Sequence, residues 1–164
     1  MSDSATRLPD DARERLAAWR AAGETIVFTN GVFDLLHRGH AEYLEEAAAL
    51  GDRLVVGIND DASVRRLKGP DRPVVPEHER RELLAALRCV DLVVLFGEDT
   101  PARVIAEVAP DVLVKGGDWP LDRIVGRDLV EAHGGRVLTV AVREGHSTSR
   151  LIERIRSGKS ALDA

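Results

Sequence analysis

The chain has 164 residues, of which 44% are hydrophobic and 31% charged, and its formal net charge is −5 at pH 7. A chain of this length folds as one domain with a sizeable hydrophobic core. The acidic balance excludes a general attraction to nucleic acid or to an anionic membrane surface, so neither is expected as a partner. The single cysteine, Cys89, excludes an internal disulfide, and its apolar surroundings favour a buried structural thiol.

The N-terminal segment is polar and acidic, without the apolar stretch of a secretion signal. No segment is apolar over enough residues to span a bilayer. The sequence therefore predicts a cytoplasmic protein.

Short apolar strands alternate with helices along the rest of the chain. In chain order the predicted elements are helix 10–22, strand 25–30, helix 39–50, strand 53–59, helix 61–67, helix 77–88, strand 91–96, helix 100–109, strand 112–117, helix 127–135, strand 136–142 and helix 147–156. Strands made of continuous Val, Ile and Leu are typical of a parallel sheet that is covered on both faces. We therefore predict an α/β fold, a Rossmann-like, doubly wound five-stranded parallel sheet in a single domain.

In a sheet of this kind, ligands bind outside the carboxyl ends of the strands, where the strand order reverses. Four loops are expected to leave those ends: 29–40, 59–76, 115–122 and 141–149. They hold most of the side chains that are able to do chemistry.

Two histidines, His37 and His40, flank Gly39 where the second helix is expected to begin. A metal pair is one interpretation, but it lacks a third ligand at helical spacing. Histidines that only cap the helix are a second. The third is anion binding, because Gly39 lets a phosphate approach the backbone and the helix N-terminus offers N–H groups and a partial positive charge. Neither the G-x-G-x-x-G fingerprint nor the P-loop motif is present, so a phosphate site here is of another kind.

The last predicted helix begins with three hydroxyl residues, Ser147, Thr148 and Ser149, directly after the fifth strand. One of them is expected to be the N-cap. Three in a row, after Gly145 and before Arg150, also suit a polyphosphate at a helix N-terminus. The two helix starts lie on loops that converge at one edge of the predicted sheet, which favours a shared polyphosphate site.

The motif G-V-F-D-L-L-H-R-G-H between the first strand and its helix, together with the later Ser/Thr cluster, resembles the HxGH nucleotidyltransferase (cytidylyltransferase-like) superfamily. Within it, the chain is most similar to the D-glycero-β-D-manno-heptose 1-phosphate adenylyltransferase domain of bacterial ADP-heptose synthases. The similar stretches include "TNGVFDLLHRGH", "VLVKGGDW" and "GHSTSRLIERI". The resemblance implies a nucleotidyltransferase domain at 25–156, an N-terminal helical extension at 1–24 and a frayed C-terminal tail at 157–164.

The resemblance implies transfer of AMP from ATP to heptose 1-phosphate, which gives ADP-heptose and pyrophosphate. His37 and His40 are then donors to the triphosphate, Lys68 is a mobile cation and Arg80 a fixed one. Substrate binding is expected from Asp34 and Asp118, through sugar hydroxyls or a Mg²⁺-bound water. The expected nucleotide-binding residues are Asn30, Gly31, Phe33, Gly39, Gly116, Trp119, Ser147, Thr148 and Ser149.

Two of these assignments have equally good structural interpretations. Asp34 is placed to cap the helix that follows it, and Trp119 would serve equally well as a packing residue. Mg²⁺ is expected to arrive on the phosphates of ATP, without a protein metal site. The resemblance also implies a homodimer.

Two other functions remain open at this point. A CTP-dependent, glycerol-3-phosphate-type cytidylyltransferase would use the same chemistry, because phosphate-binding residues do not select the base. A nucleotide-binding regulatory domain without catalysis is disfavoured, because the HxGH motif, Lys68, Arg80 and the Ser/Thr cluster are all present.

Overall fold

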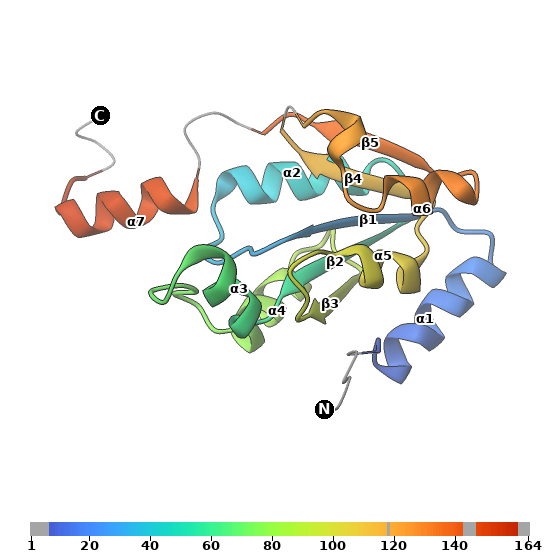
Figure 1. Cartoon of the computed structure of the whole chain (residues 1–164), viewed down its shortest axis with the longest axis horizontal. Helices are drawn as coiled ribbons and strands as arrows, with labels where there is room; N and C mark the ends of the chain where they lie inside the picture. The colour runs from blue at the N-terminus through green and yellow to red at the C-terminus, as the bar shows by residue number, and fades with distance from the viewer. Residues whose placement is uncertain (1–6, 118, 143–146, 161–164) are drawn as a thin grey trace.

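A five-stranded parallel sheet forms the centre of the protein, in the strand order β3-β2-β1-β4-β5. The computed structural model describes residues 7–117, 119–142 and 147–160 (Figure 1). The strands are β1 (Ile26–Gly31), β2 (Arg53–Asn59), β3 (Leu92–Phe96), β4 (Val112–Gly116) and β5 (Arg136–Val140). The predicted fold class is confirmed.

Helices connect the strands, as the sequence predicts. They are α1 (Asp10–Ala21), α2 (Arg38–Ala48), α3 (Asp61–Lys68), α4 (Glu77–Ala85), α5 (Ala102–Val108), α6 (Arg127–Ala132) and α7 (Thr148–Ser157). The 3₁₀ turn η1 (Leu121–Arg123) was not predicted. Among the described residues, no helix is long and apolar enough to cross a membrane.

The strand order reverses at β1, which lies between β2 and β4. The ladder between β1 and β2 is long and runs from Ile26↔Arg53 to Gly31↔Ile58. The ladder between β1 and β4 consists of only two pairs, Val27↔Val112 and Phe28↔Leu113. The carboxyl ends of β1 and β4 are therefore not joined by ladder hydrogen bonds, and this is the switch point at which such sheets bind ligands.

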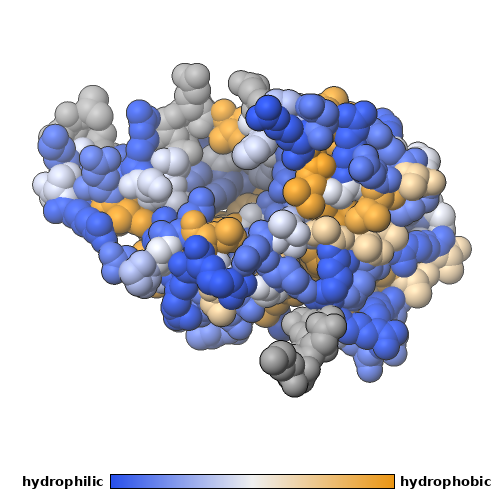
Figure 2. Space-filling view, viewed as in Figure 1, coloured by the Kyte–Doolittle hydropathy of each residue, from blue (hydrophilic) through white to orange (hydrophobic). Residues whose placement is uncertain are grey.

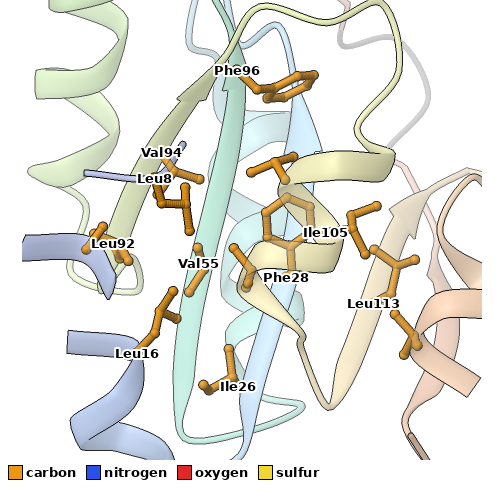
Figure 3. Close-up of a cluster of buried hydrophobic side chains, with 14 of the residues drawn as sticks. Leu8, Leu16, Ile26, Phe28, Val55, Leu92, Val94, Phe96, Ile105 and Leu113 are labelled. Carbon is orange, nitrogen blue, oxygen red and sulfur yellow. The ribbon is translucent and has the colours of Figure 1, made fainter. Parts of the chain in front are cut away.

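Each face of the sheet has its own hydrophobic core. On one face, α1, α5 and α6 pack on side chains such as Ile26, Phe28 and Leu113 (Figure 3). On the other face, α2 and α4 pack on side chains that include Val27 and Val56. Figure 1 shows α7 extending away from the sheet, at the opposite end of the molecule from α1.

The first helix is part of the main core. Leu8, Ala12 and Leu16 are at most 4% exposed and belong to the same cluster as the strand residues of that face. The spacing of four residues places Ala12 and Leu16 on one side of the helix, and Leu8 precedes the helix. The described part of the predicted extension, from Leu8 onward, thus contributes packing to the domain that follows it.

Candidate active site

A cavity of about 460 Å³ opens at the carboxyl edge of the sheet, over β1 and β4. The loops after β1, β4 and β5 form its walls, together with the first turns of α2 and α7. Of the predicted site residues, it is lined by Asn30, Gly31, Phe33, His37, Gly39, His40, Gly116, Trp119, Ser147 and Thr148. The predicted residues Asp34, Lys68, Arg80 and Ser149 are not on its wall, and the loop at 59–76, expected to converge here, does not line it.

His37 and His40 are stacked at the N-terminus of α2. Their ring centroids are 3.8 Å apart and the ring planes differ by 18°. His37 is the N-cap, and its Nδ1 accepts a long hydrogen bond of 3.4 Å from the backbone N–H of His40. Because Nδ1 of His37 accepts, the proton of the neutral ring is on Nε2, which makes Nε2 a donor. The capping and the anion-binding interpretations of His37 are therefore compatible with each other.

The environment of His40 keeps its ring neutral. Burial lowers the pKa of His40 to about 4, and the adjacent His37 adds to this effect. The Leu35 carbonyl acts in the opposite direction, but buried Nδ1 makes no hydrogen bond to any described residue. A neutral imidazole has one N–H that can donate a hydrogen bond, but it has no acidic proton to transfer at neutral pH. His40 is thus suited to donate a hydrogen bond to an anion and poorly suited to be a general acid.

The N-terminus of α7 forms another part of the same cavity. Ser147 is its N-cap, and its Oγ accepts from the N–H of Arg150 at 3.2 Å, which confirms that one of the three hydroxyls is a cap. Ser147 and Thr148 line the cavity, whereas Ser149 lines a separate groove. Two helix N-termini therefore point their partial positive charges at one cavity.

Two glycines at the strand ends allow close packing of the cavity floor. A Cβ on Gly116 would lie 2.9 Å from Val142 Cγ2 and 3.3 Å from Tyr43 Cε2. A Cβ on Gly31 would lie 2.9 Å from the ring of Phe33, which itself has a positive φ of 48°. The Phe33 ring lies 5.2 Å from the His40 ring, so this strained turn packs against the imidazole.

Lys115 is a cavity residue that the sequence analysis did not single out. It is the penultimate residue of β4, and its Nζ donates to Asn30 Oδ1 at 2.7 Å across the gap between β4 and β1. Burial lowers the pKa of Lys115 to about 8. The available signal was a lysine inside an otherwise apolar strand, "VLVKG".

The carboxylate of Asp34 holds the loop at 69–76. It is 1% exposed and pairs with Arg72 Nε at 2.6 Å. The N–H groups of Val74 and Val75 also donate to it, at 2.8 to 2.9 Å. Burial raises the pKa of Asp34, but the two N–H donors and Arg72 outweigh it, so the net pKa is lowered. Asp34 does not cap α2, because His37 does, and its binding of sugar stays a prediction.

Arg80 is fully buried, at 0% exposed, beneath the cavity. Its guanidinium donates to the carbonyls of Val75, Val32 and Asn59 at 2.7 to 2.9 Å. It also pairs with Asp61 at 2.8 Å. These contacts hold the guanidinium in place and direct it at the protein. A contact with phosphate stays a prediction.

Lys68 lies in a second groove of about 370 Å³, between the loop after α3 and the helix α7. Ser149 faces it from α7, and Arg72 lies on the same side as Lys68. Figure 2 shows the surface hollowed between α7 and the body of the domain. Lys68 is exposed at the last position of α3, so it belongs to the helix and not to the loop in which the sequence placed it. Its role as a mobile cation stays a prediction.

Two further predictions concern the loop after β4. Trp119 lines the cavity and is 58% exposed, which favours contact with a ligand over a packing role. Asp118 lies outside the described residues. Within the ranges that the structure describes, no group of three or more His, Cys, Asp or Glu is arranged to hold a metal ion.

A sequence model of the family described as cytidylyltransferase-like matches residues 28–159, most of the chain. The chain belongs to the cytidylyltransferase-like family. The superfamily that the sequence motifs indicated is therefore confirmed.

The chain is similar in sequence to bifunctional HldE proteins from several bacteria. It is 55% identical over 153 residues to the bifunctional protein HldE of Syntrophotalea carbinolica, which covers 93% of this chain and 31% of that protein. It is 60% identical over 136 residues to the bifunctional protein HldE of Coxiella burnetii, which covers 83% and 29% respectively. The chain thus spans about a third of the length of these relatives.

A solved structure gives the same fold. The lipopolysaccharide core biosynthesis protein of Thermoplasma volcanium is 33% identical, with a TM-score of 0.60. The match covers 76% of this chain and 100% of that one.

Proposed function

We propose that this domain transfers AMP from ATP to D-glycero-β-D-manno-heptose 1-phosphate, with ADP-heptose and pyrophosphate as products. The observation that carries the proposal is the pair of helix N-termini at one cavity, α2 with its stacked His37 and His40, and α7 with Ser147 and Thr148. The high identity to HldE proteins and the likeness to a lipopolysaccharide core biosynthesis protein support a role in surface-sugar metabolism.

The reaction needs little proton transfer. A phosphate monoester has a second pKa of about 6, so the acceptor is already an anion at neutral pH. One of its oxygens forms a bond to the α-phosphorus of ATP, and the bond from that phosphorus to the bridging oxygen breaks. The electron pair leaves with pyrophosphate. The protein is left to hold two anions in line and to stabilise the charge at the α-phosphate.

The described residues suit that task. Neutral His40 and the Nε2–H of His37 donate to the triphosphate without giving up a proton, and the N-terminus of α7 adds N–H groups. Lys68 closes on the phosphates from its groove, which requires movement of the loop after α3. Arg80 and Asp34 hold the backbone on either side of Phe33. Mg²⁺ enters bound to ATP and makes few or no contacts with protein ligands.

The proposal extends to the assembly and the compartment. We infer a homodimer from the resemblance, and a sedimentation measurement at micromolar concentration that finds only monomer would contradict it. We also infer a cytoplasmic location, because the proposed reaction uses ATP.

The decisive experiment measures pyrophosphate release with ATP or CTP, each combined with heptose 1-phosphate or glycerol 3-phosphate. We expect the highest kcat/KM for ATP with heptose 1-phosphate. A preference for CTP with glycerol 3-phosphate would favour a cytidylyltransferase, and no turnover with any pair would favour a regulatory nucleotide-binding domain.

A further inference from the structure

The Lys115 side chain is a half-buried cation on the wall of the cavity. The partner of its Nζ is the neutral amide oxygen of Asn30, at 2.7 Å. Within the described part of the chain, no carboxylate forms an ion pair with it. Taking a charge out of water is costly unless an opposite charge compensates for it. An apolar side chain would fill this strand position at a lower cost in stability, so the lysine is better explained by a ligand.

The alternation of side chains along β1 and β4 shows on which face of the sheet Lys115 lies. Side chains alternate between the two faces of a strand. Leu113 of β4 and Phe28 of β1 belong to the core on the α5–α6 side, and Lys115 and Asn30 lie two positions further along the same strands. Lys115 and Asn30 therefore face the α5–α6 side of the sheet, where Pro101 and Ile124 also line the cavity.

The stacked histidines enter the cavity from the opposite face. The helix that carries them, α2, packs through Tyr43 and Leu44 into the other core. The cavity thus has phosphate donors from α2 on one side and the Lys115 ammonium on the other. An in-line displacement needs groups on two opposite sides, because the nucleophile must approach the α-phosphorus from the side opposite the leaving pyrophosphate.

We propose that Lys115 binds the phosphate of the acceptor, the nucleophile of the reaction, while Asn30 orients the ammonium. The inference rests on the proposed function in one respect, that the acceptor is phosphorylated. Lys115 keeps its proton throughout, since the attacking oxygen is already anionic. Its charge brings the acceptor phosphate to the α-phosphate despite the repulsion between the two anions.

The test compares Lys115→Met and Lys115→Arg with the wild-type protein. KM is measured for heptose 1-phosphate at saturating ATP, and for ATP at saturating heptose 1-phosphate. We expect Lys115→Met to raise KM for the acceptor by about 10- to 100-fold, the scale of a charge-assisted hydrogen bond, and to leave KM for ATP within about twofold. Lys115→Arg should fall between Lys115→Met and wild type. The matched control is Lys159→Met, an exposed lysine, which should change neither KM.

Thermal unfolding separates binding from a structural role. Removal of a half-buried charge that no described carboxylate pairs with should leave the melting temperature of Lys115→Met equal to or above that of wild type. A lower melting temperature with an unchanged acceptor KM would assign Lys115 to the fold and overturn the proposal. A rise in KM for ATP alone would assign Lys115 to nucleotide binding and would also overturn the proposal.

The role of Lys115 can fail or hold independently of the proposed choice of substrates. If the wild-type protein uses another phosphorylated acceptor, the same comparison is made with that compound, and a selective rise in its KM supports the role of Lys115. Turnover of a non-phosphorylated acceptor alone would overturn both.

Discussion

Protonation of His40 is expected to destabilise the fold in mild acid. The pKa of this ring falls from 6.5 to about 4 on folding, because the ring is partly buried and lies against His37. Between those two values the unfolded chain binds a proton that the folded protein does not. The contribution of neutral His40 to the free energy of unfolding is therefore fully present above pH 6.5 and is lost as the pH falls toward 4.

The size of the effect follows from the same two values. A tenfold change in proton affinity corresponds to about 1.4 kcal/mol. A fall in pKa from 6.5 to about 4 then lowers the free energy of unfolding by on the order of 3 kcal/mol at pH 4, relative to pH 7. This is a large share of the stability of an ordinary domain.

The assay is urea unfolding of the wild-type protein and of His40→Gln at pH 7, 6, 5 and 4. It is followed by tryptophan fluorescence, which reports unfolding because Trp19 packs against the core. The glutamine variant cannot gain this proton, so its disadvantage should shrink by about 3 kcal/mol as the pH falls. Asp34, whose lowered pKa also makes the fold acid-sensitive, is common to both proteins and cancels. Parallel curves of unfolding free energy against pH would refute the reasoning.

Three substitutions test the other roles. His40→Ala should lower kcat by on the order of 10²–10³, the loss seen for one transition-state donor, and a near-wild-type kcat would remove it from the catalytic groups. Lys68→Ala should lower kcat without changing the melting temperature, since a cation that closes on phosphate acts in the closed complex. Unchanged kinetics would return it to the ordinary surface lysines. Arg80→Met should lower stability by about 3–5 kcal/mol, because Asp61 and three carbonyls lose their donor, and an unchanged melting temperature would contradict that network.

The fold was predictable because its strands are buried on both faces. Such strands read as unbroken apolar runs, and glycines such as Gly23 and Gly51 follow the helices between them. Each predicted helix and strand is present, with ends shifted by a few residues. The turn η1 was missed because three residues have no periodicity to detect.

The site was predictable only in outline. Parallel strands bring their carboxyl ends to one edge, and two helix starts, with His37 and His40 on one and Ser147 and Thr148 on the other, do lie around one cavity. Sequence order does not give the direction of a side chain or its distant partners. Ser149 therefore lies in the second groove, and Asp34 is bound by a loop about 40 residues further along the chain. The inference about Lys115 depends on which described groups surround its ammonium, and a sequence does not show these neighbours.

The packing of α1 has a consequence for how this domain joins other proteins. Leu16 is 1% exposed beneath the sheet, and Arg15 and Arg20 donate to the backbone carbonyls of Asp91 and Val108. A fusion joint placed at residue 24, where the sequence pattern suggests a border, would remove part of the core. A partner domain is better grafted ahead of Leu8, and a protease that cuts between Leu8 and Ile26 should release a fragment that aggregates.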